Sequence, residues 1–226
     1  MYYDQWKSKA GFKEYVKNLQ EFGQLDQLVM DYIETKLHHK IIRKPQKGKE
    51  DGKDIVAVED EMTGEYCCYV VKRGNLTCSA LKGKCGVLKQ IEEAMLIELE
   101  ESEYYNKKRT VIVVYNGEKV TRDANKKYYS KKYEVEKLVG DLLLRPIEKW
   151  DLNYIVDEFF SIGCELKARE ETRLWYEKLN LHQKLNLHKS SEAQNLINCD
   201  APKGHLKLFV LDYIKSVEDI EREYNI

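Results

Sequence analysis

Residues 52–74 read GKDIVAVEDEMTGEYCCYVVKRG, and this stretch decides the fold. It contains two apolar runs, 54–60 and 66–73, separated by the turn signal MTGE. Short runs rich in valine and tyrosine predict strands, and a short turn between them predicts a β-hairpin. Because both runs are apolar at nearly every position, we expect both faces of the hairpin to be covered.

The flanking sequence predicts helices on both sides of this hairpin. Apolar residues recur at intervals of three and four over 4–37 and again from residue 87, which predicts helices. HHKIIRK is a candidate short strand, RTVIVVYNG (109–117) is a strongly β-branched strand, and PIEKWD is a candidate further short strand. Asp151 can cap the helix that follows. This order predicts an α/β fold with a mixed sheet.

The character of the chain changes after Gly163, where charged helical segments replace the strand pattern. We therefore predict a first domain over 1–162, which includes the N-terminal helices, and a helical C-terminal extension over 163–226. The last amphipathic helix would carry its apolar side chains on one face, either as internal packing or as a surface for a homodimer or a partner protein. These side chains are Leu206, Phe209, Val210 and Tyr213.

Composition limits the classes of partner. The chain has 38 Lys and Arg against 39 Asp and Glu, so binding to nucleic acid would need a local basic patch. No apolar run approaches the length of a membrane span, which requires about 18 residues, so we expect no membrane partner. Adjacent Cys67 and Cys68 on a strand point to opposite faces, which favours a reduced cytoplasmic protein over a disulfide scaffold.

Asp54 and Lys72 are the residues that could carry chemistry. In a hairpin, the start of the first strand lies near the end of the second, so the two side chains can approach each other at one edge of the sheet. A carboxylate that holds a divalent cation, beside a lysine that positions water, is an arrangement used for phosphodiester cleavage. Strands also commonly end on solvated charges, and the two residues taken alone leave both interpretations open.

The order of these elements resembles the PD-(D/E)xK nuclease superfamily. The resemblance rests on GKDIVAV with Asp54, a turn, CYVVKRG with Lys72, a helix bearing Gln90, and then VIVVYNG, and it spans about residues 22–162. It implies a restriction-endonuclease-like mixed sheet flanked by helices and a metal-dependent DNA nuclease of a bacterial defence or DNA-processing system. Asp54 would bind Mg²⁺, Lys72 would position the attacking water, and Gln90 would shape the site.

Val70 departs from the family pattern, because it occupies the position of the second carboxylate and cannot ligate a metal. Either a carboxylate of the preceding helix, Glu34 or Asp31, supplies the missing oxygen, or the site is inactive. In the second case the fold would serve as a nucleic-acid or protein binding module.

Tyrosine pairs at 104–105 and 128–129 lie among lysines. That mixture can contact phosphates and stack on bases. The plainer interpretation is a solvated helix face on which the lysine stems cover apolar surface.

Overall fold

The computed structural model describes residues 8–45, 52–82, 86–163, 165–167, 169–170 and 173. The chain divides into two compact units, Met1–Ser161 and Ile162–Ile226. Nearly all of the predicted extension over 163–226, including the apolar side from Leu206 to Tyr213, lies outside the described residues. The fold described below is that of the first unit.

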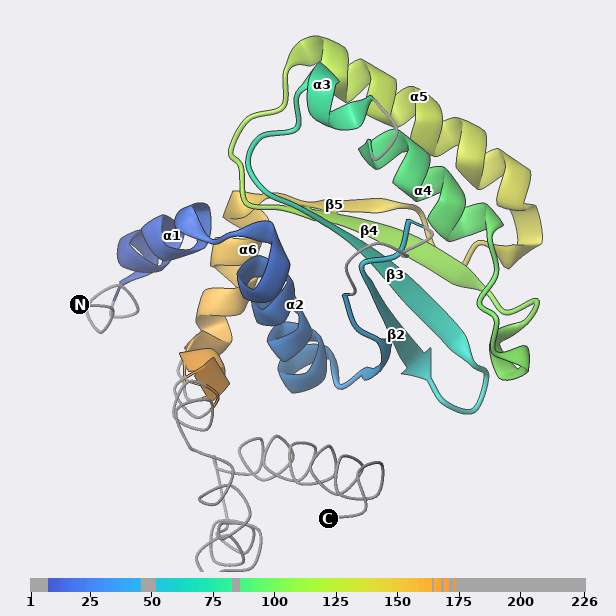
Figure 1. Cartoon of the computed structure of the whole chain (residues 1–226), viewed down its shortest axis with the longest axis horizontal. Coiled ribbons are helices and arrows are strands. Elements are labelled where there is room, and N and C mark those ends of the chain that lie inside the picture. Colours follow the sequence, from blue (N-terminus) through green and yellow to red (C-terminus); the bar gives the residue numbers. More distant parts are fainter. Residues whose placement is uncertain are drawn as a thin grey trace, which may run out of the picture. The chain divides into compact units, whose positions relative to one another are not determined.

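The first unit is an α/β fold with a five-stranded mixed sheet of order β1-β2-β3-β4-β5 (Figure 1). The antiparallel part comprises β1 (Lys40–Arg43), β2 (Ile55–Asp60) and β3 (Glu65–Lys72). The parallel part continues from β3 to β4 (Arg109–Tyr115) and β5 (Glu148–Trp150). The predicted hairpin and the predicted class, a mixed sheet flanked by helices, are both confirmed.

Parallel neighbours require crossover connections, and these are helical. The chain passes from β3 to β4 through α3 (Cys78–Leu81) and α4 (Val87–Leu96), and from β4 to β5 through α5 (Arg122–Val139). Both crossovers advance in the same direction across the sheet. Because such connections share one hand, their helices lie on the same face (Figure 1).

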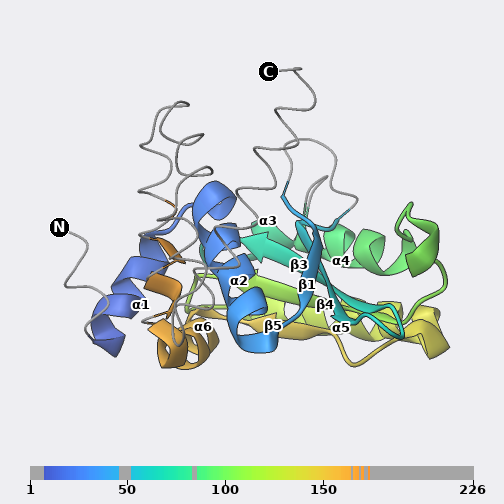
Figure 2. The same cartoon turned by 90° about the horizontal axis from the view of Figure 1, so that it is seen from below.

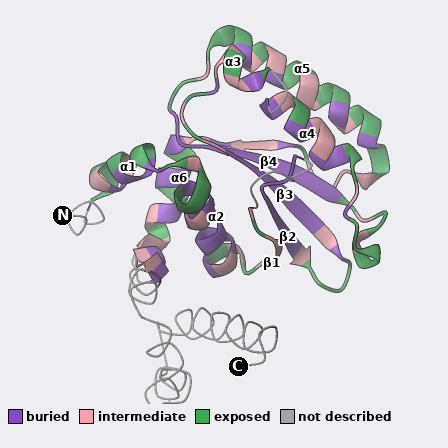
Figure 3. Ribbon diagram, viewed as in Figure 1, coloured by how far each residue is buried: buried purple, intermediate pink, exposed green. Residues whose placement is uncertain are grey.

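The opposite face is covered by α2 (Asp26–Tyr32) and α6 (Leu152–Phe159), and α1 (Lys9–Asn18) packs against α6. Figure 2 shows α1 and α6 side by side, and Lys9 of α1 forms an ion pair with Asp157 of α6. With helices on both faces, the apolar strands are buried along almost their whole length (Figure 3).

The two faces of the sheet have different cores. The face under α4 and α5 is mainly aliphatic, with strand residues such as Val56, Cys68 and Val113 packed on Ile91 and Met95. The other face is aromatic. There the rings of Tyr32 and Phe159 stack at 3.8 Å between centroids, and Trp150 meets both Tyr32 and Tyr69 edge-on.

Cys67 and Cys68 point to opposite faces, as the period-two pattern predicts. The Cys68 thiol faces the Ala94 carbonyl of α4, whereas Cys67 contacts Glu59 and Arg145. Cys67, Cys68 and Cys78 are all free thiols.

Side chains satisfy backbone groups at two helix ends. Asp151 caps α6, because its Oδ1 accepts the Tyr154 N–H at 2.9 Å, which confirms the predicted cap. The helix predicted from residue 87 is shorter than its pattern indicates and ends at Leu96. Arg109 Nε donates to the Met95 carbonyl at 2.8 Å and so satisfies one of the acceptors at that helix end.

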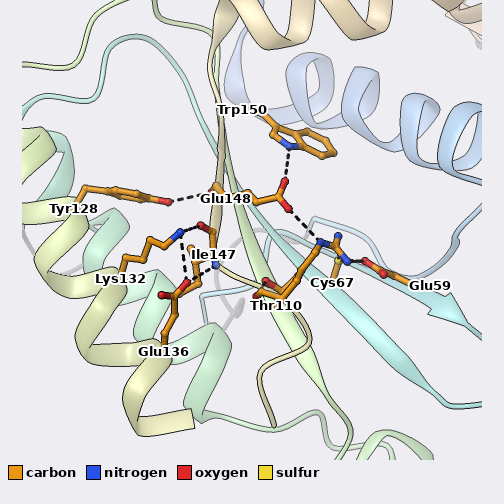
Figure 4. A network of polar contacts seen from close by, with 10 residues as sticks. Glu59, Cys67, Thr110, Tyr128, Lys132, Glu136, Ile147, Glu148 and Trp150 are labelled. Carbon is orange, nitrogen blue, oxygen red and sulfur yellow. Dashed lines mark hydrogen bonds and ion pairs between the residues drawn. The ribbon is translucent and has the colours of Figure 1, made fainter. Parts of the chain in front are cut away.

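The edge strand β5 is held by a polar network (Figure 4). Side chains of α5 satisfy the backbone there: Lys132 donates to the Ile147 carbonyl, and Glu136 accepts the Ile147 N–H at 2.6 Å. On the aromatic face, Arg145 is paired with Glu59 and Glu148. Since an unprotected edge strand invites pairing with other chains, we interpret this network as structural.

Within the residues that the structure describes, no helix combines the length and the apolar character needed to cross a membrane.

Candidate active site

The end of the β2–β3 hairpin brings Asp54 and Lys72 together. Asp54 immediately precedes β2 and its N–H donates to the Tyr69 carbonyl at 3.0 Å, while Lys72 is the last residue of β3. Lys72 Nζ lies 3.9 Å from Asp54 Oδ2, and the two side chains are 18% and 9% exposed. Asp54 Oδ2 also accepts the Val71 N–H at 2.6 Å, so the carboxylate is fixed against β3.

A second carboxylate, that of Glu21, completes this cluster. Its Oε1 lies 2.9 Å from Lys72 Nζ, and its Oε2 accepts the Arg73 N–H at 3.0 Å. The neighbouring Gln20 accepts a hydrogen bond from the Arg73 guanidinium at 2.8 Å. Lys72 is therefore held between two acidic side chains. Glu21 lies 51 residues before Lys72 in the chain, and Asp54 directly precedes β2.

The helical spacing over 4–37 does not single out Glu21, because it predicts helix at that position. The structure ends α1 at Asn18, and the next segment, η2 (Glu21–Leu25), has non-helical backbone at Phe22 and Gly23. Gly23 has φ of +77°, a left-handed conformation that favours glycine. A glycine near a helix end is a stop signal, and it was the one local indication that Glu21 leaves the helix.

Asp26 is a further acidic group in this region, only 4% exposed. Burial raises the pKa of Asp26, and the nearby Glu21 charge raises it further. Hydrogen bonds from the Gly23 and Gln27 backbone oppose this rise. The folded protein therefore favours the protonated form of Asp26 more than the unfolded chain does.

The Asp26→Asn variant tests this pKa shift. A carboxyl group whose pKa is raised on folding stabilises the fold fully below its unfolded pKa, and that contribution is lost as the pH rises through the folded pKa. The free energy of unfolding of the wild type, relative to Asp26→Asn, should therefore fall as the pH rises above the ordinary value of 3.8. Urea denaturation of both proteins across this range measures the difference. Asp157→Asn is the control for the loss of a carboxylate at an exposed position.

Val70, at the position where the family pattern has a second carboxylate, is fully buried in the aliphatic core beneath α4. A carboxylate at this position would be enclosed by apolar side chains. A second carboxylate near Lys72 comes from another element instead, since Glu21 is the acid that contacts Lys72 together with Asp54.

Glu34 and Asp31 are the two acids predicted to supply the carboxylate that is missing at Val70. They lie further along the N-terminal helices. Asp31 is buried in α2 and accepts a hydrogen bond from Gln27 Nε2 at 3.0 Å. Glu34 belongs to η3 (Ile33–Leu37) and is half-buried. The role of Glu34 as a metal ligand stays a prediction, for which Glu21 is now a competing candidate.

Gln90 lies on the buried side of α4 and is 7% exposed. Its Oε1 is buried and has no hydrogen-bond partner among the residues that the structure describes. The backbone of α4 at Gln90 packs directly against Gly52, two residues before Asp54: a Cβ on Gly52 would lie 2.4 Å from the Gln90 carbonyl oxygen. This close contact places the turn that precedes Asp54 against α4.

Gly52→Ala is expected to destabilise the protein by about 3 kcal/mol, because it adds a steric overlap to a left-handed backbone conformation with φ of +74°. Gly23→Ala separates the two effects. Gly23 also has positive φ, +77°, but its Cβ would meet no atom within 4 Å, so only the conformational cost of about 1 kcal/mol applies. Chemical denaturation measures both values, and equal losses would contradict the close packing of Gly52 on α4.

The donor set suits a hard divalent cation, since Asp54 and Glu21 offer carboxylate oxygens on either side of one point. Lys72 Nζ occupies that point, so a cation there requires the lysine side chain to move. Among the described residues, no group of three Asp, Glu, His or Cys side chains is placed to hold a metal ion. Family models, curated proteins and solved structures were each compared with the chain, and none of them matches it.

Proposed function

We propose that this chain is a metal-dependent nuclease that cleaves DNA, with its active site at Asp54, Lys72 and Glu21. The observation that carries the proposal is the contact of Lys72 Nζ with both carboxylates at the end of the β2–β3 hairpin. Two acids and a lysine, partly shielded from solvent, are the side chains that metal-assisted phosphodiester hydrolysis uses.

The order of the strands supports the same proposal. The resemblance to the PD-(D/E)xK superfamily implies a hairpin with an aspartate and a lysine, followed by a helix with a glutamine and a further strand. Here β2 and β3 are followed by α4 with Gln90 and by β4, which pairs in parallel with β3. These relationships favour a restriction-endonuclease-like fold over an unrelated α/β arrangement.

Each side chain has a separate task in the proposed reaction. Asp54 and Glu21 would hold Mg²⁺, which when bound stabilises the negative charge that develops on the phosphate and activates water. Lys72 would orient the attacking water through hydrogen bonds from its ammonium group. Gln90 would shape the site from α4, where its unsatisfied Oε1 can accept a hydrogen bond.

A cleavage assay tests the proposal. The full chain is incubated with single-stranded and duplex DNA in the presence of Mg²⁺ and, in parallel, with a chelator. We expect cleavage that the chelator abolishes and that the Asp54→Asn and Lys72→Ala variants lack. Cleavage that both variants retain would rule out this site.

A catalytically silent binding module is the second candidate function, and Val70 is the observation that favours it. Lys72 and Glu21 also have a structural task, because their contact and the Glu21–Arg73 hydrogen bond attach the N-terminal segment to β3. If binding of DNA is unaffected by Mg²⁺ and no cleavage is detected, this function replaces the first.

A further inference from the structure

The outer face of α5 carries a stripe of cationic and aromatic side chains, here called the α5 stripe. It consists of Arg122, Lys126, Tyr129, Tyr133 and Lys137. Their spacing of three or four residues places them on one side of the helix. All five are exposed, including the large rings of Tyr129 at 51% and Tyr133 at 70%.

The fold determines which side of α5 is exposed. Ala124, Tyr128, Val135 and Val139 pack into the aliphatic core, so the stripe lies on the side away from the sheet. The tyrosine pair at 128–129 is split by this packing. Tyr128 is 1% exposed and structural, whereas its neighbour Tyr129 faces solvent.

The cations of the stripe are not neutralised by neighbouring acids. Arg122, Lys126 and Lys137 form no hydrogen bond or ion pair with the described residues. The lysines of α1 provide a contrast, since each of them is paired with a carboxylate: Lys9 with Asp157, Lys13 with Glu118 and Lys17 with Glu14.

The acidic residues of α5 lie beside the stripe and not within it. Glu134 is paired with Lys131, and Glu136 is engaged by Lys132 and the β5 backbone. Asp123 is in the first helical turn, where a negative charge complements the helix dipole. The stripe therefore offers net positive charge to a partner.

Tyr129 is held in place before any partner binds. Lys149 Nζ lies 4.8 Å from the centroid of its ring and is itself hydrogen-bonded to Asn125 at 2.9 Å. The buried Tyr128 ring meets Tyr129 edge-on at 5.5 Å between centroids. A ring that is already oriented loses less conformational entropy when another ring stacks on it.

We propose that the α5 stripe binds single-stranded DNA, with its cations on the phosphates and its two exposed tyrosines stacked on bases. Cations alone would serve a duplex equally well. The tyrosine rings decide between the two, because bases inside a duplex already stack on each other, whereas those of a single strand are open to aromatic side chains.

The choice of DNA as the ligand rests on the proposed function. The α5 stripe would determine which form of DNA reaches the candidate active site. In the β3–β4 pairing, Lys72 lies opposite Tyr115, and the segments that follow the two strands remain in contact through the bridge between Leu76 and Val120. The start of α5 therefore lies at the same end of the sheet as the end of β3 (Figure 1). These two element ends carry Arg122 and Lys72.

Binding is measured with the full chain and a fluorescent oligo(dT) of about 20 nucleotides, which exceeds the usual site size for one binding groove. A chelator is present throughout, so the result is independent of cleavage. The double variant Tyr129→Ala/Tyr133→Ala should weaken binding by about thirtyfold or more. Replacing both tyrosines by phenylalanine keeps the rings and should change the affinity by less than about twofold. Tyr154→Ala is the aromatic control, because Tyr154 is 36% exposed and lies on α6, outside both tyrosine pairs.

A salt titration tests the cations separately. The triple variant Arg122→Ala/Lys126→Ala/Lys137→Ala should reduce the slope of log K against log salt by about 2, since each neutralised phosphate of a single strand contributes about 0.7. The control removes the same charge elsewhere, at Lys9, Lys17 and Lys40, which are ion-paired with Asp157, Glu14 and Glu61. It should leave the slope nearly unchanged.

Three results would overturn the inference: tighter binding of a duplex of the same length than of the single strand, binding that the tyrosine variants do not weaken, and self-association of the chain that depends on the two tyrosines. Loss of cleavage alone does not bear on the stripe. Conversely, single-strand binding through the stripe without any Mg²⁺-dependent cleavage would overturn the nuclease proposal and leave this inference in place.

Discussion

Glu21→Gln is expected to reduce Mg²⁺-dependent DNA cleavage by at least about a hundredfold, as are Asp54→Asn and Lys72→Ala. The amide variants are nearly isosteric. An amide at position 54 can still accept the Val71 N–H, and one at position 21 can still accept the Arg73 N–H, so the fold should be retained. What both amides lose is the charge that a divalent cation requires.

The comparison of Glu21→Gln with Glu34→Gln decides which carboxylate completes the site. Glu21 contacts Lys72 in the structure, so we expect Glu34→Gln to keep cleavage within about twofold of the wild type. When activity is titrated with Mg²⁺, only the variants at 21 and 54 should need a higher Mg²⁺ concentration than the wild type to reach half of their maximal activity. If instead Glu34→Gln abolishes cleavage and Glu21→Gln does not, the helix-borne acid predicted from the sequence is the ligand.

Circular dichroism and thermal unfolding of each variant separate chemistry from stability. Lys40→Ala is a suitable control for the loss of an ion-paired lysine. Lys40 is 59% exposed and pairs with Glu61. Glu61 lies in the β2–β3 turn, at the opposite end of the hairpin from Asp54 and Lys72. Surface ion pairs of this kind contribute at most about 1 kcal/mol. A folded Lys72→Ala protein with wild-type cleavage would show that Lys72 has only the structural task of attaching the N-terminal segment.

Asn116→Ala is expected to lower the free energy of unfolding by about 3 kcal/mol. Asn116 follows β4, is 1% exposed, and links three segments of the chain. Its Nδ2 donates to the Val16 and Leu19 carbonyls at 2.9 and 3.1 Å, and its Oδ1 accepts the Gly74 N–H at 2.6 Å. Alanine would leave these backbone groups without their partner, and an unsatisfied buried polar group is costly.

The matched control is Asn153→Ala, which removes an exposed asparagine that accepts a hydrogen bond from Lys13 at 3.1 Å. Its expected cost is within about 0.5 kcal/mol. Chemical denaturation measures both. A cost below about 1 kcal/mol for Asn116→Ala would show that water replaces the lost contacts.

Asn116 also connects stability to the candidate site. It ties the end of α1, which leads into Glu21, to Gly74, which follows Lys72 and Arg73. We therefore expect the folded fraction of Asn116→Ala to cleave DNA more slowly than the wild type, because Glu21 is held less firmly beside Lys72.

The sequence by itself determined the features that depend only on residues close together in the chain. Alternation and apolar content predict the β2–β3 hairpin, and with it the approach of Asp54 to Lys72, because residues at the two ends of a hairpin are neighbours by geometry. The same holds for the opposite directions of Cys67 and Cys68 and for the Asp151 cap, each of which depends on a few adjacent residues.

Only the tertiary structure decided which side chains from distant segments meet. Glu21 reaches Lys72 across 51 residues, and Asn116 reaches Val16 across 100, and neither contact has a periodic pattern that could reveal it. The packing of α5 likewise buries Tyr128 and exposes Tyr129, although the two are adjacent in the chain. Strand and turn preferences act over a few residues, whereas these contacts arise only when the elements pack and their polar groups find partners.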